Sequence, residues 1–153
     1  MALVISVEDP LTPDIEALLQ AHLDFCHEVT PAEHSFALDV EKLRVPGITF
    51  FAAREDGVLL GVGALKELGD GAGELKSMHT ALAARGKGVG TAIVQQILVH
   101  ARSIRLSRIN LETGSHSPYE PARRLYASLG FHPAPPFGDY LPSDFNTFMS
   151  ISL

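Results

Sequence analysis

A glycine-rich turn is the segment of this sequence whose residue types point most directly to chemistry. It runs Arg85-Gly86-Lys87-Gly88-Val89-Gly90-Thr91, and residues with the apolar spacing of a helix follow it at once. Glycines at alternate positions let backbone N–H groups approach a ligand where a side chain would intrude. The start of a helix adds unpaired N–H groups and the positive end of its dipole. The turn therefore predicts an anion site suited to a pyrophosphate, with Arg85 and Lys87 as reinforcing cations.

Better known phosphate and metal motifs do not match this sequence. A Walker A loop needs Ser or Thr after Gly-Lys, and here Gly88 follows Lys87. The dinucleotide fingerprint follows the first strand of a βαβ unit, whereas three strand-like segments precede this turn. The histidines show no H-E-x-x-H spacing, and Cys26 falls on an apolar helix face. We therefore predict neither a metal site nor a cysteine nucleophile.

The elements before the turn are strands joined by tight turns. Strand-like runs occur at residues 3–7, 48–53, 58–65 and 74–79. Glycine-containing turns separate the last three runs, which indicates an antiparallel meander. Thr12 and Pro13 predict the start of a helix that reaches Cys26, and a second short helix is expected around Phe36 to Leu43.

The elements after the turn alternate between helix and strand. The turn opens a helix whose Val89, Ile93 and Ile97 share one face. This helix crosses over to a strand at 108–112, which should lie parallel to the strand ending near His79. A helix around 122–129 and a closing strand at 147–153 follow. We expect one domain over residues 1–153, of α+β class, with a mixed, mostly antiparallel sheet of about six to seven strands and about four helices.

Composition narrows the classes of function. The net charge is −6, and no cluster of Lys or Arg suggests binding to nucleic acid. No apolar run approaches the roughly 18 residues of a membrane span. The first residues lack the features of a signal peptide, and a single cysteine suits a reducing compartment, so a cytoplasmic location is expected. The acidic balance weakly favours a cationic small molecule as partner, and homodimer formation is left open.

Two motifs resemble those of the GNAT (Gcn5-related) N-acetyltransferases. Arg85-x-x-Gly88-x-Gly90 resembles the Q/R-x-x-G-x-G/A motif of that family. Leu125-Tyr126-Ala127-Ser128-Leu129-Gly130-Phe131 resembles its L-Y-x-x-x-G-F signature. The resemblance covers about residue 48 to the C-terminus. The segments 74–78, 111–115 and 136–140 look closest to the bacterial YsnE-type branch.

The resemblance implies a fold detail and a co-substrate. The sheet should splay between its fourth and fifth strands, acetyl-CoA should be the acyl donor, and no metal is implied. The N–H of Met78 would polarise the thioester carbonyl. Thr80 stands where Val is commoner, and Tyr119 replaces an Asn that often contacts the cofactor. The residues implied to contact acetyl-CoA are Met78, His79, Thr80, Arg85, Gly86, Lys87, Gly88, Val89, Gly90 and Thr91.

The resemblance also directs attention to an acid and a base. Transfer to an amine needs a group that takes its proton, and Glu74 is the first candidate because period-two counting places it on the strand face of Met78. Glu112, at the end of the neighbouring strand, is the second. Tyr126 is the candidate acid that returns a proton to the thiolate. The alternative to catalysis is that Glu74 and Glu112 are surface carboxylates and that Tyr126 only packs in the core.

These observations predict one reaction and leave other functions as alternatives. We expect a cytoplasmic N-acetyltransferase that transfers acetyl directly to a small primary amine, such as an amino acid or amine metabolite. Phe137, Asp139 and Tyr140 would line the acceptor pocket, because a constrained loop places them between the last helix and the closing strand. The alternatives are acetylation of a protein lysine or N-terminus, a non-catalytic acyl-CoA-binding module, and a nucleotide-binding regulator.

Overall fold

Seven strands and three α-helices organise the part of the chain that the computed structural model describes, residues 3–30 and 40–153. The strands are β1 (Leu3–Val7), β2 (Ile48–Glu55), β3 (Val58–Gly69), β4 (Ala72–Thr80), β5 (Arg108–Gly114), β6 (His132–Pro133) and β7 (Asn146–Ser152). The helices are α1 (Pro13–Val29), α2 (Val89–Ser103) and α3 (Glu120–Ser128). The strand order in the sheet is β1-β2-β3-β4-β5-β7-β6.

The sheet is mixed, as predicted. β4 and β5 are parallel, and every other neighbouring pair is antiparallel. The parallel pair is the one joined through α2, because a crossover helix returns the chain to the same end of the sheet. The predicted α+β class is therefore confirmed. The short helix expected around Phe36 to Leu43 falls partly on residues 31–39, which lie outside the described residues, and its described part is the 3-10 helix Glu41–Arg44.

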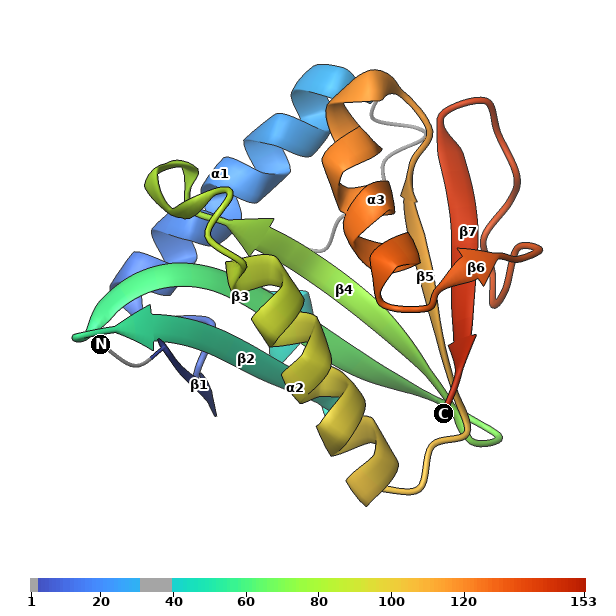
Figure 1. Cartoon of the computed structure of the whole chain (residues 1–153), viewed down its shortest axis with the longest axis horizontal. Coiled ribbons are helices and arrows are strands. Elements are labelled where there is room, and N and C mark those ends of the chain that lie inside the picture. The colour runs from blue at the N-terminus through green and yellow to red at the C-terminus, as the bar shows by residue number, and fades with distance from the viewer. Residues whose placement is uncertain (1–2, 31–39) are drawn as a thin grey trace.

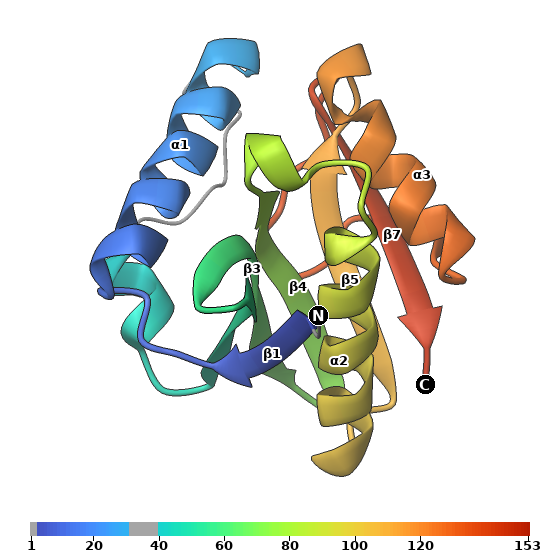
Figure 2. The same ribbon diagram turned by 60° about the vertical axis from the view of Figure 1, so that its left-hand side comes forward.

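Helices cover both faces of the sheet (Figure 2), with α1 on one face and α2 and α3 on the other. Ile93 and Ile97 of α2 are fully buried against one face, and Ile15 and Leu19 of α1 occupy the core on the other. Complete burial of one such side chain stabilises the fold by roughly 1.5–3 kcal/mol. The apolar stripes of the helices thus fix where the functional segments lie. None of the helices in the described ranges is long and apolar enough to cross a membrane.

Candidate active site

The start of α2 presents unpaired backbone N–H groups. Gly86 and Gly88 have φ of +78° and +80°, and an added Cβ at either glycine would meet no atom within 4 Å. The first hydrogen bond of the helix runs from the N–H of Ala92 to the carbonyl of Gly88, at 3.0 Å. The preceding helical amides, from Val89 to Thr91, point out of the helix end. This geometry fits the predicted anion site.

Gly90 has a different task from the other two glycines. A Cβ on Gly90 would lie 2.9 Å from Cδ1 of Leu125, in α3. The missing side chain therefore allows α2 and α3 to approach each other closely. The sequence predicts ligand approach for all the glycines of the turn, and for Gly90 helix packing is an added role.

β4 and β5 separate along their length. Their pairing extends only from Ala72–Arg108 to Leu75–Leu111, although β5 stays paired with β7 as far as Gly114. Figure 1 shows the two strands together at one end and apart at the other. The guanidinium of Arg123 donates to the carbonyl of Gly114 at 2.6 Å, where a continuous sheet would bring a strand partner. The predicted splay is present.

A β-bulge in β4 lies at the opening of this splay. Ser77 has a φ of +56°, and the pairing with β3 shifts register between Lys76 and His79. An added Cβ on Gly63 would be 2.4 Å from the Met78 sulfur and 2.9 Å from Ile93 of α2. The Met78 side chain therefore faces α2, whereas Glu74 lies on the opposite face. The prediction that Glu74 and Met78 share one strand face is therefore wrong, because the extra residue of a bulge reverses the alternation.

A large cavity runs from this splay to the start of α2. Its volume is about 580 Å³. Its walls are β4 beyond the bulge, the glycine turn, α3 and part of α1. The lining residues include His79, Thr80, Arg85, Gly86, Gly88, Val89, Gly90, Thr91 and Leu125. Of the residues that the family resemblance implies for acetyl-CoA, all except Lys87 line this cavity, Met78 included.

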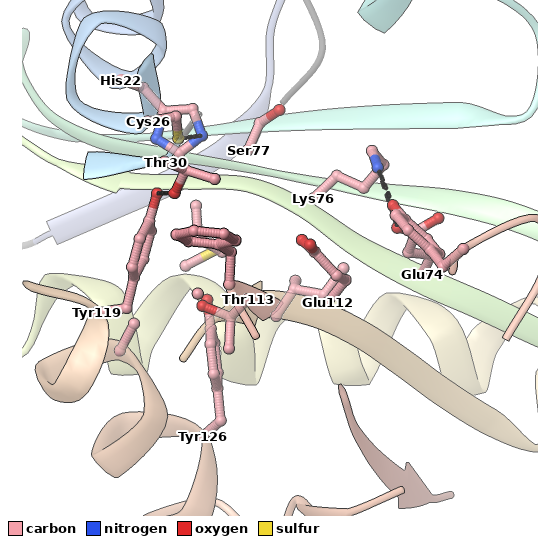
Figure 3. A pocket seen from close by; sticks show the side chains of 16 residues that line it. His22, Cys26, Thr30, Glu74, Lys76, Ser77, Glu112, Thr113, Tyr119 and Tyr126 are labelled. Atoms are coloured by element: carbon pink, nitrogen blue, oxygen red, sulfur yellow. Dashed lines mark hydrogen bonds and ion pairs between the residues drawn. The ribbon is translucent and has the colours of Figure 1, made fainter. Parts of the chain in front are cut away.

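A smaller cavity of about 110 Å³ lies on the other side of the splay. Its lining includes the middle of β4 and the C-terminal end of β5, with Glu74, Lys76 and Glu112 (Figure 3), together with Tyr140. The residues that line both cavities are His22, Met78, Tyr119, Ala122 and Tyr126. The two cavities therefore adjoin beside the bulge.

Comparison with known proteins agrees with this architecture. The model that describes the acetyltransferase (GNAT) family matches residues 15–131. The chain belongs to the GNAT acetyltransferase family. It is 41% identical to the uncharacterized N-acetyltransferase YsnE of Bacillus subtilis, over 97% of this chain and 99% of that protein. The resemblance to the YsnE-type branch is thereby confirmed.

Solved structures of this family share the fold. A Klebsiella pneumoniae protein assigned as an acyl-CoA N-acyltransferase superposes with a TM-score of 0.81 at 25% identity, covering 99% of this chain and 97% of that one. An aminoglycoside 6'-N-acetyltransferase, complexed with coenzyme A, has a TM-score of 0.71 at 18% identity, covering 97% and 96%. The chain is therefore an acyltransferase of GNAT fold.

Glu74 is buried and already engaged. Its Oε2 atom accepts a hydrogen bond from the Lys76 ammonium at 3.0 Å and another from the Tyr140 hydroxyl. The Lys76 ammonium also donates to the Tyr140 oxygen at 2.7 Å. The Glu74 side chain is only 4% exposed and that of Lys76 9%. Glu74 is therefore not a surface carboxylate, although it does pair with Lys76.

Glu112 has the surroundings of a proton acceptor. Burial raises its pKa to about 7, against the opposite effects of a hydrogen bond from Asn146 and the charge of Lys76. Glu112 follows Leu111, the last β5 residue paired with β4, so it lies where the strands part. A carboxyl group with a pKa near the working pH can exchange its proton readily.

Tyr126 lies on the opposite side of the splay, on α3. Its ring is buried and packs against Phe131, and burial raises the pKa of its phenol. In Figure 3 the Tyr126 side chain extends toward Thr113, at the junction of the cavities. The tyrosine is therefore both a core residue and a wall of the site, so packing alone does not decide its role.

The loop after β6 contributes one wall of the smaller cavity. Tyr140 lines the cavity, and Phe137 packs edge-on against it with ring centroids 5.0 Å apart. Asp139 is exposed and is not among the residues that line either cavity. Of the predicted acceptor residues, Tyr140 therefore lines the site and Phe137 packs behind it. Asp139 lines neither cavity.

Two residues of α1, His22 and Cys26, line the site although the sequence did not predict a role for them there. Nδ1 of His22 lies 3.2 Å from Nδ1 of His79, and Nε2 of His22 lies 3.8 Å from the Cys26 sulfur. Burial lowers the pKa of both histidines to about 4, so both are neutral at pH 7. The available signal was the i, i+4 spacing of His22 and Cys26 on the apolar face of α1.

Tyr119 occupies the space beside Gly114. An added Cβ on Gly114 would lie 1.9 Å from the Tyr119 ring, so β5 needs glycine there. The Tyr119 hydroxyl lies 3.3 Å from the Thr30 hydroxyl at the end of α1. The residue that replaces the family's common Asn therefore joins α1 to the start of α3 and forms part of both cavities.

Proposed function

We propose that this chain transfers the acetyl group of acetyl-CoA directly to the amine of a small primary amine. The observation that carries the proposal is the junction of two cavities at Met78 and Tyr126. The larger cavity ends at the free amides of α2, which suit a pyrophosphate. The smaller contains Glu112, which suits an amine that must lose a proton. The aminoglycoside enzyme of the same fold is complexed with coenzyme A.

In this proposal each residue of the junction has one task. The amides of the glycine turn and of Val89 to Thr91 bind the pyrophosphate, and the strand from Met78 to Thr80 aligns the pantetheine arm. The N–H of Met78 stabilises negative charge that develops on the carbonyl oxygen. Glu112 takes the proton of the attacking amine. Tyr126 gives a proton to the departing thiolate, since a phenol that remains neutral at pH 7 can serve as an acid.

The volume of the smaller cavity favours a small acceptor. About 110 Å³, bounded by α1, β4, β5 and the loop with Tyr140, suits a metabolite better than a folded protein surface. Acetylation of a protein lysine or N-terminus is the second candidate, because an extended side chain can enter a narrow site. A non-catalytic acyl-CoA-binding module is the third, and it would need neither Glu112 nor Tyr126.

An acetylation screen tests the proposal. Purified protein is incubated with acetyl-CoA and a panel of amino acids, mono- and diamines, and lysine-containing peptides, and released thiol is followed. We expect thiol release with at least one small amine and none without an acceptor. Release with peptides alone would replace the small-molecule proposal by protein acetylation. Tight acetyl-CoA binding without release on any acceptor would favour the binding module.

A further inference from the structure

A buried ion pair occupies one wall of the smaller cavity. Lys76, Glu74 and Tyr140 bond to one another, with the Lys76 ammonium 3.0 Å from Glu74 and 2.7 Å from the Tyr140 oxygen. Removing two charges from water is costly, and an apolar pair of similar size is often as stable. A buried pair that lines a substrate cavity is therefore better explained by what it binds than by the stability it provides.

Within residues 3–30 and 40–153, the bonds of the Lys76 ammonium leave one donor for a ligand. An ammonium has three N–H groups, and the bonds to Glu74 and Tyr140 use two of them. Burial raises the pKa of Tyr140, so its hydroxyl stays protonated and donates to Glu74. Tyr140 and Glu74 thus hold Lys76 in place. A ligand anion could accept the remaining N–H without displacing either partner.

The lining of the cavity combines the ammonium of Lys76 with the carboxyl group of Glu112. Among the described residues that line it, Lys76 is the one lysine or arginine, and His22 is neutral at pH 7 because burial lowers its pKa to about 4. Glu112 lies close enough to Lys76 for the ammonium charge to lower its pKa. In Figure 3 the Glu112 side chain lies between Thr113 and Lys76. A cation and a carboxyl group therefore stand side by side in a small space.

We infer that the acceptor is an amine that carries a carboxylate on a neighbouring carbon, that is, an α-amino acid. Its carboxylate accepts a hydrogen bond from Lys76, and its amine lies toward Glu112. Lys76 is the specificity-determining residue, and Glu74 and Tyr140 are positioning residues. This inference rests on the proposed function, since it names the substrate class of the same site. It does not depend on the identity of the amino acid side chain.

Matched acceptor pairs test the inference on the native protein. Each pair is an amino acid and the amine made by its decarboxylation, such as phenylalanine and phenethylamine, or alanine and ethylamine. We expect kcat/KM to be higher for the amino acid by about 10-fold or more, because a buried donor left unpaired rejects the analogue that lacks the acceptor. Equal or better use of the simple amines would overturn the inference and leave the proposed function intact. Failure with every amine would instead count against the proposed function.

A double variant locates the preference. Glu74→Gln with Lys76→Met removes both charges together, so neither is left buried alone. We expect its KM for amino acids to rise about 10-fold or more, with KM for simple amines and for acetyl-CoA changed less than about 3-fold. Lys66→Met, on β3 beside Glu74, is the matched control and should keep the preference. Lys76→Arg should retain part of it. Parallel losses for both acceptors of a pair in a folded double variant would overturn the assignment to Lys76.

Discussion

Glu74 and Glu112 are neighbours on one face of the sheet, but their surroundings suit them to different tasks. The Oε2 atom of Glu74 already accepts hydrogen bonds from an ammonium and a phenol, so Glu74 is engaged with neighbouring side chains. Glu112 has its pKa raised by burial to about 7. The geometry thus favours the second sequence candidate over the first as the base, while both assignments remain proposals.

Replacement of Glu112 should change how the rate depends on pH. A base must be deprotonated, so kcat/KM should rise with pH through about 7 in the native enzyme. Glu112→Gln should lower kcat by roughly 10²–10⁴-fold and remove that limb of the profile. Rate–pH profiles with one acceptor, for this variant and for Glu74→Gln, measure the effect. A limb near pH 7 that persists without Glu112, and disappears without Glu74, would assign the base to Glu74.

Tyr126→Phe separates the chemical role of the tyrosine from its packing. The ring is buried against Phe131, and the substitution keeps that contact. If the phenol protonates the thiolate, turnover should fall roughly 10²-fold while both KM values change little. Turnover and thermal unfolding are measured on the same sample. Native turnover, whether or not the variant unfolds at a lower temperature, would make Tyr126 a residue of the core alone.

At the scale of elements, three local features create the site. The bulge at Ser77 turns the Met78 side chain to the α2 face, the bonds of Arg123 to Gly114 and His116 hold the end of β5, and Gly90 lets α3 approach α2. The bulge and the Arg123 bonds both involve backbone groups that a regular sheet would pair internally. The cavities thus lie where regular structure is interrupted.

The start of α2 can be tested with two matched glycines. Gly88 and Gly57 have φ of +80° and +81°, and neither has an atom within 4 Å of an added Cβ. Alanine at either position should cost about 1–2 kcal/mol of stability through backbone strain. Of the two variants, only Gly88→Ala should weaken acetyl-CoA binding, because the added methyl group would occupy the space of the pyrophosphate. Calorimetric affinities that are equal in the two variants would remove the turn from the proposed donor site.

The contact between α1 and β4 should make stability depend on pH. The pKa of His22 and of His79 is lowered from 6.5 to about 4, so the unfolded chain binds their protons first as pH falls. Their contribution is complete above about pH 6.5 and is lost progressively toward pH 4. Denaturant unfolding across this range should show a smaller loss for His22→Gln than for the native protein. His27→Gln, on the exposed side of α1, should behave as the native protein does; equal slopes for all three would contradict the account.

At the scale of the whole molecule, the sequence predicts what depends on local periodicity. Apolar residues that repeat every two residues predict the strands, and a repeat of 3.6 residues predicts the long helices. The positions of the glycines predict the turn before α2. The splay came from the family resemblance, since nothing in the strand residues themselves specifies it. Ser77 gave no signal for a bulge, because serine rarely adopts a positive φ. The contacts of His22 with His79 and of Tyr140 with Glu74 join residues far apart in the chain, which no local pattern reports.

The central claim is that the two adjoining cavities bring acetyl-CoA and a primary amine together for direct transfer. Single-turnover kinetics, with the protein in excess over acetyl-CoA and an amine found in the screen, tests it most directly. Mass spectrometry of quenched samples follows the acetyl group on the amine and on the protein. We predict that acetyl appears on the amine in step with loss of acetyl-CoA, while the protein stays unmodified throughout. An acetylated protein that forms first and then decays as the product appears would contradict direct transfer.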